Sequence, residues 1–244
     1  MTPYEAMVAV NHRMIRYGAD SVSAEERAVL VSVFLSAVTD REKAERFYAA
    51  VRFPGNCDKS GRRLYPAFLI PPYNGGKTYA TILGQVPRTH ILSANGYELE
   101  ILRLLHLLAP DHPAVQDMND KTLDRLRHTC FANEDDGLGE CFDTNLIALR
   151  YLGTVSPAST GWMRERTDVF HRHYGEKKRP WQTMWYYYLC LSELPYSVVS
   201  ADLERYRNAM LRFLETYGGV TGERQELLLA ILRQCVRRQG EISL

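Results

Sequence analysis

The chain has little of what marks several common protein classes. Its 30 Lys and Arg residues nearly balance its 29 Asp and Glu, so the formal net charge is +1 over 244 residues. Such a chain has no overall field to steer it to nucleic acid or to an anionic membrane. No stretch approaches the roughly 20 consecutive apolar residues of a membrane-spanning helix, and the first residues lack the apolar core of a secretion signal. We therefore expect no nucleic-acid and no membrane partner.

Cysteine is scarce, and its spacing fits no paired motif. The five cysteines are an odd number and contain no C-x-x-C pair. Without a secretion signal we expect a cytoplasmic protein whose thiols stay reduced. The sequence likewise offers no complete metal-ligand or cofactor motif, so we predict neither a metal nor a cofactor.

What is present indicates one folded protein with three zones. Hydrophobic residues make up 45% of the chain and charged residues 24%, which is typical of a globular domain. We predict helices packing on the core over 1–53 and a segment rich in proline and glycine over 54–95. A helical repeat region follows over 96–244, and we expect one compact domain overall.

The middle zone has the composition of two strands around a turn. The stretches "RLYPAFLI" and "KTYATILGQV" flank "PPYNGGK", which contains the Asn-Gly turn signal. We predict a small β-hairpin insertion near residues 62–88. As a flap over a nearby site, it would bring Tyr73 and Tyr79 towards a ligand.

The last zone contains a repeated pattern. Leucines within "ILR", "ALR", "LCL" and "ILR" recur at intervals of 47, 42 and 41 residues, at Leu102, Leu149, Leu191 and Leu232. A period of this size is typical of stacked helical pairs. The leucines lie in helices that are apolar on nearly every side: 97–108, 142–153, 183–194 and 226–236.

Helices with one polar face lie between these apolar ones. An all-round apolar helix is buried, whereas an amphipathic helix covers it on the outside. We therefore predict a mainly α protein of the α/α helical-repeat kind, toroid or solenoid-like. The arrangement resembles α/α-toroid and helical-repeat proteins in general. An irregular helical bundle with similar helix lengths remains the alternative.

A toroid would bring the N-terminal ends of its inner helices to one face. The acids near those ends are our catalytic candidates: Glu98, Glu140, Asp143 and Glu223. Clustered carboxylates raise one another's pKa, which suits acid–base work. The simpler interpretation is that each acid caps its helix.

The stretch "EDDGLGECFDTN" (134–145) resembles known motifs only in part. An EF-hand would require an acid where Ala132 stands. The spelling "DDGLGE" resembles the DDxxD/E motif of class I terpene synthases, but two glycines disfavour the helix that this motif needs. A zinc site would need a histidine from elsewhere. Cys141, at a helix start, is a candidate thiolate nucleophile or a packed thiol.

An aromatic stretch follows, "WQTMWYYYLCLSELP". Core packing is its simplest role, but buried tyrosine hydroxyls need polar partners, which a cavity wall would supply. Such a wall would suit a sugar, an aromatic or an isoprenoid. Our ligand-binding candidates are Trp181, Trp185, Tyr187, Tyr188, Tyr73, Tyr79 and Asn145.

These features support two functions, and whether the protein is an enzyme stays open. The first is a helical-repeat protein that binds a peptide or protein partner in a cleft at the inner-helix N-termini. The alternative is an enzyme acting on a carbohydrate or isoprenoid-like substrate, with the carboxylates and the aromatic wall in a toroid cavity. A small immunity-type or other accessory protein is a third possibility. The partner is thus an unknown small molecule, peptide or protein.

Overall fold

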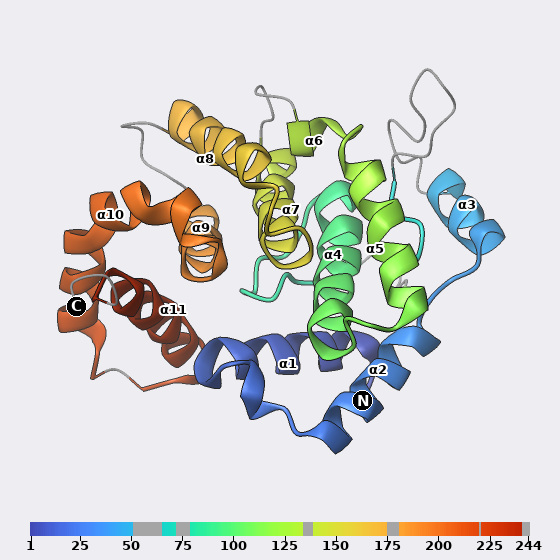
Figure 1. The fold of residues 1–244 in the computed structure, drawn as a ribbon, viewed down its shortest axis with the longest axis horizontal. Helices are drawn as coiled ribbons and strands as arrows, with labels where there is room; N and C mark the ends of the chain where they lie inside the picture. The colour runs from blue at the N-terminus through green and yellow to red at the C-terminus, as the bar shows by residue number, and fades with distance from the viewer. Residues whose placement is uncertain (51–64, 72–78, 134–138, 175–180, 220, 241–244) are drawn as a thin grey trace.

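A computed structural model describes residues 1–50, 65–71, 79–133, 139–174, 181–219 and 221–240. These residues are mainly helical (Figure 1), which confirms the predicted class. The helices are α1 (Pro3–Tyr17), the 3-10 turn η1 (Ala19–Ser21), α2 (Ala24–Ser36), α3 (Arg41–Ala50), α4 (His90–Leu108), α5 (Pro113–Leu126), α6 (Cys130–Asn133), α7 (Glu140–Val155), α8 (Thr160–Tyr174), α9 (Trp181–Glu193), α10 (Tyr196–Tyr217) and α11 (Glu223–Gly240).

The first helices begin and end where local side chains dictate. Ser23 accepts the backbone N–H of Glu26, and the Glu26 carboxylate accepts the N–H of Ser23, which confirms the predicted capping box of α2. A second capping box starts α1. That helix ends at Gly18, whose φ of 83° is a conformation that glycine adopts easily.

Two kinds of helix differ in how much of their surface is buried. Every residue from Leu92 to Leu105 of α4 and from Thr144 to Leu152 of α7 is buried. By contrast, α10 buries a single stripe that includes Val199, Leu203 and Met210. All-round burial thus matches the apolar pattern in α4 and α7, whereas α11, predicted from the same pattern, exposes Glu226 and Arg233.

Contacts between helices link the central ones in sequence. Helix α4 contacts α7, α7 contacts α9, and α9 contacts α11, while α1 contacts both α11 and α4. In Figure 1, α5, α8 and α10 lie to the outside of this set. Helices α4 and α7 pack closely, since a Cβ on Gly96 would lie 3.3 Å from Cδ1 of Ile147.

The predicted β-hairpin is wrong. In the described parts of that insertion, 65–71 and 79–88, the backbone forms no strand ladder. Leu69 instead makes an isolated antiparallel bridge with Val38, and a turn links Thr81 to Gln85 through Gly84. The turn residues of "PPYNGGK" after Pro71 lie outside the described residues. The physical reason is that the Glu98 carboxylate takes the N–H groups of residues 67–69, while the backbone of residues 81–85 bonds within its own turn.

Candidate functional site

Glu98 lies about two turns into α4, not in its first turn, and it is fully buried. Its Oε1 accepts the backbone N–H groups of Ala67 (2.9 Å), Phe68 (2.7 Å) and Leu69 (3.2 Å). Its Oε2 accepts a hydrogen bond from Nη2 of Arg125 at 2.8 Å. Both oxygens therefore bind the protein's own chain and hold the segment 65–71 against α4.

Glu140 is the first residue of α7, and it fixes the start of a different helix. Its carboxylate accepts the backbone N–H groups of Arg88 (2.5 Å) and Thr89 (2.6 Å). Thr89 is the N-cap of α4. The N-terminal ends of α4 and α7 are therefore joined, and Glu140 is only 7% exposed.

Asp143, in the first turn of α7, joins two further parts of the chain. Its Oδ2 accepts a hydrogen bond from Nε2 of Gln85, and its Oδ1 accepts one from the hydroxyl of Thr183 at the start of α9, each at 2.7 Å. Burial raises the pKa of Asp143 above its ordinary value; these two hydrogen bonds oppose the shift, and the neighbouring Glu140 adds to it. The carboxylate has a perturbed pKa, but its partners belong to the protein.

Glu223, the first residue of α11, is placed differently from the other three acids. Its side chain is 80% exposed and lies 3.8 Å from Nη2 of Arg16 on α1. Thus Glu140 and Asp143 are brought together, Glu98 is buried within α4, and Glu223 faces solvent and α1. The four carboxylates do not surround one shared point.

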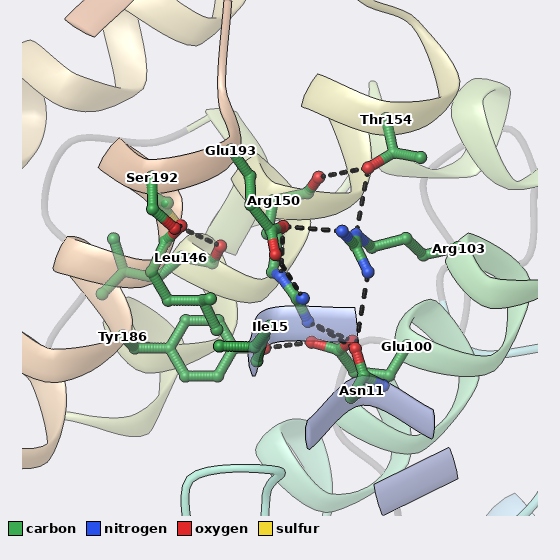
Figure 2. Close-up of polar contacts among 12 residues, drawn as sticks. Asn11, Ile15, Glu100, Arg103, Leu146, Arg150, Thr154, Tyr186, Ser192 and Glu193 are labelled. Carbon is green, nitrogen blue, oxygen red and sulfur yellow. Dashed lines mark hydrogen bonds and ion pairs between the residues drawn. The ribbon is translucent and has the colours of Figure 1, made fainter. Parts of the chain in front are cut away.

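A buried ionic network, which sequence reasoning missed, lies between the central helices (Figure 2). The Arg150 guanidinium donates to Glu100 at 2.6 Å and to both oxygens of Glu193 at 2.7 and 2.8 Å. Arg103 donates to the same Glu193 carboxylate at 2.7 Å. Burial opposes ionisation of Glu193, but Arg103 and Arg150 outweigh it and hold the pKa of Glu193 below its ordinary value. Two cations and two anions thus balance in the interior.

A polar group from one more helix, α1, and a second group from α9 complete this network. Asn11 of α1 accepts a hydrogen bond from Arg150 at 3.0 Å, and the Tyr186 hydroxyl of α9 donates to Glu100. Figure 2 shows these groups meeting from α1, α4, α7 and α9. The network fixes the mutual position of four helices and has its main hydrogen-bonding groups paired.

The signal for this network was present in the sequence. Glu100 and Arg103 interrupt the apolar run "LEILRLL", and Arg150 interrupts "LIALRYL". A charge on a helix that is buried all round needs a buried partner. As a repeated pattern, "ILR" and "ALR" predict stacked helices but not this network. Arg233 of the last "ILR" is exposed, so the motif does not have one role.

The central helices leave little empty space beside the network. A cavity bordered by Ser93, Tyr97, Glu100 and Tyr186 has a volume of about 10 Å³, enough for about one water molecule. Burial, and to a lesser degree Tyr79, raises the pKa of Tyr97 to about 12. The centre is therefore a packed polar core.

Two open hollows meet at the N-terminal end of α11. One, of about 620 Å³, lies between α1, α11 and residues 82–84. The other, of about 700 Å³, lies between the first turns of α9 and α11. They share Glu223, Arg224 and Leu228, so we treat them as one feature, the α11 groove. Its lining includes Val8, His12, Arg13, Arg16, Ile82, Leu83, Trp181, Gln182, Thr221, Arg224, Leu227 and Leu228.

The predicted aromatic wall divides between core and surface. Trp181 is 52% exposed and lines the α11 groove, while Trp185 behind it is buried, with ring centroids 5.3 Å apart. Tyr187 is buried, donates to Asp202 at 2.6 Å and stacks on Phe170, so it belongs to the core. Tyr188 is half-buried, and its ring contacts Trp185. Of this stretch's aromatic candidates, Trp181 is the one that reaches the groove.

The remaining ligand candidates have other positions. The Tyr79 ring lies 4.4 Å from that of Tyr4 on α1 and borders the small central cavity. Asn145 is buried and donates to the Phe131 carbonyl at 2.6 Å, which holds α6 against α7. Tyr73 lies outside the described residues.

The metal and nucleophile alternatives gain nothing from the geometry. Within the described ranges, no group of three or more His, Cys, Asp or Glu residues is placed to hold a metal ion, although 134–138 lies outside those ranges. Burial raises the pKa of the Cys141 thiol, with smaller contributions from Cys130 and Glu140. A raised pKa disfavours the thiolate form that a nucleophile requires.

Comparison with known proteins adds no assignment. No protein family, curated protein or solved structure matches this chain. Among the helices described, none is long and apolar enough to cross a membrane. The geometry of the molecule itself is therefore the guide to its function.

Proposed function

We propose that the protein binds a peptide or protein partner in the α11 groove. The observation that carries this proposal is the groove itself, which is open, has an apolar floor that includes Leu227 and Leu228, and has charged residues along its rim. Protein interfaces have this pattern of apolar centre and polar rim. Trp181, a residue type enriched among binding hot spots, is exposed at one end.

We propose further that the central helices form the inner layer of an α/α helical repeat, toroid or solenoid-like. Helices α4, α7, α9 and α11 contact one another in order, and α1 contacts the first and the last. The Glu140–Thr89 and Asp143–Thr183 contacts place the N-terminal ends of α4, α7 and α9 together. In this arrangement the α11 groove is the open part of that face, and residues 79–89 fill the rest.

The geometry favours binding over catalysis on a carbohydrate or isoprenoid-like substrate. Such an enzyme would need an enclosed cavity of a few hundred cubic ångströms with acids directed into it. Glu98, Glu140 and Asp143 instead accept hydrogen bonds from the protein, and the central cavity has room for about one water molecule.

We propose that this binding takes place in the cytoplasm. The cysteines within the described residues are free thiols, with Cys190 and Cys235 buried and Cys130 exposed. Free thiols persist in a reducing compartment. The expected partner is therefore an intracellular peptide segment or protein.

The proposal is tested by selecting short random peptides, displayed on phage, against the purified full chain. Ala9 is an exposed residue that lines the groove, so Ala9→Trp should fill the groove and abolish binding of the selected peptides. Ala201→Trp, at an exposed position on α10, is the matched control and should leave binding unchanged. Peptides that bind the wild type and Ala9→Trp equally would show that the groove is not the binding site.

A further inference from the structure

We infer that the partner segment of the α11 groove is acidic, with an Asp or Glu side chain flanked by apolar residues. This inference rests on the proposed function and specifies the partner's chemistry. The apolar floor accounts for the flanking residues. The acidic residue follows from which charged groups of the groove already have partners.

Two carboxylates in and around the groove are already engaged. Glu5 closes the capping box of α1, and Glu26, just outside the groove, accepts a hydrogen bond from Arg13 at 2.7 Å. Glu223 is exposed and lies 3.8 Å from the Arg16 guanidinium. A basic partner would have to compete with the capping box for Glu5 and with Arg13 for Glu26.

The charges of two groove arginines, by contrast, have no close carboxylate. Arg224 is exposed in the first turn of α11 and has no ion pair or hydrogen bond with another described residue. Arg16 donates from Nη2 to the backbone carbonyl of Glu223 at 2.7 Å, but its two ion pairs, with the carboxylates of Glu223 and Glu226, are long at 3.8 and 3.9 Å. The groove thus has a guanidinium charge that is weakly paired on each of two walls.

The position of Arg224 strengthens this argument. The first turn of a helix is the positive end of its dipole, where a cation is disfavoured and an anion is favoured. A carboxylate near Arg224 would offset both the charge of the side chain and the dipole. The planar guanidinium also matches a carboxylate in a two-bond arrangement. An acidic side chain that enters from solvent is therefore the complementary group.

The experiment compares the peptides selected by two forms of the full chain. Peptides selected on the wild type should be enriched in Asp and Glu beside apolar residues, and those selected on Arg224→Glu should lose this enrichment and gain Lys and Arg. For an acidic peptide taken from the first selection, Arg224→Gln should raise the Kd about fivefold, as for an exposed ion pair. Arg207→Glu, at an exposed arginine on α10, is the matched control and should change neither result.

The outcomes separate this inference from the proposed function. Peptides that Ala9→Trp displaces, but that show no acidic enrichment, would overturn the inference and leave groove binding intact. A selection that yields no peptide sensitive to Ala9→Trp would overturn both. Circular dichroism and melting curves of each variant establish that the fold is retained before binding is compared.

Discussion

Glu98 within α4 and Glu140 at the start of α7 face the protein's own backbone, whereas Gln182 at the start of α9 and Glu223 and Arg224 at the start of α11 are exposed to solvent. Glu98 and Glu140 together accept five backbone N–H groups from the segments 65–71 and 79–89. Near α11, Trp181 and Arg224 remain exposed. We refer to these regions as the closed half and the open half of one face.

A matched pair of residues shows what separates the halves. Glu140 and Glu223 each begin a helix, and each follows a glycine with positive φ, Gly139 at 58° and Gly222 at 144°. Glu140 is nevertheless buried with two backbone donors, while the side chain of Glu223 is 80% exposed. The difference lies in what packs above each helix start. A carboxylate at a helix start thus becomes an anchor or a surface group according to its tertiary neighbours.

The largest effect should follow from breaking the closed half at Glu98. Glu98→Ala leaves Arg125 buried without its carboxylate and removes the acceptor of three backbone N–H groups. We expect a loss of about 3–5 kcal/mol in the free energy of unfolding, typical of a broken buried pair, measured by urea denaturation. Glu223→Ala in the open half is the control and should cause no measurable change. Equal stability of the two variants would remove the distinction between the halves.

Local rules explain which features the sequence predicts correctly. The capping box of Ser23 and Glu26 depends on residues three apart, and burial of α4 and α7 follows from their all-round apolar pattern. The predicted hairpin failed because the N–H of Phe68 bonds a carboxylate 30 residues away. Strand composition alone cannot show that a side chain will replace the partner strand.

The candidate site was predictable only in part for the same reason. The sequence identifies acids near helix starts, but it does not show whether a later segment covers them. Glu140 is covered because Arg88 and Thr89, more than 50 residues earlier, reach it. Arg224 and the α11 groove were missed because their significance depends on α1 and residues 82–84, which are distant in sequence.

A smaller, pH-dependent effect should appear at Asp143, on the boundary between the halves. Its pKa is raised in the folded protein above the ordinary value of 3.8, so the folded state binds a proton more tightly than the unfolded state. Linkage then requires that the contribution of Asp143 to stability decreases as the pH rises from about 4 through the raised pKa. Asp143→Asn, which cannot ionise, should lack this decrease.

Urea denaturation at a series of pH values tests this directly. The free energy of unfolding of Asp143→Asn minus that of the wild type should increase with pH across the acidic range and become constant above it. Asp143→Asn also retains an oxygen acceptor for Gln85 or Thr183, so its fold should persist. A difference that does not change with pH would show that Asp143 ionises normally.

The smallest effect on stability should come from Trp181 in the open half. The side chain is half exposed and makes edge-on contact with the buried Trp185, so Trp181→Ala should cost about 1 kcal/mol or less. If Trp181 is a binding hot spot, the same change should raise the Kd for groove-binding peptides at least about tenfold, measured by fluorescence polarisation. Trp181→Phe preserves an aromatic ring and should restore much of the affinity.

If Trp181→Ala loses stability but keeps its affinity, Trp181 supports the fold, as Glu98 does. The proposed role of the open half in binding would then be wrong. A stable variant with weak binding would instead show that an exposed side chain on this face serves a partner, while the acids of the closed half serve the fold.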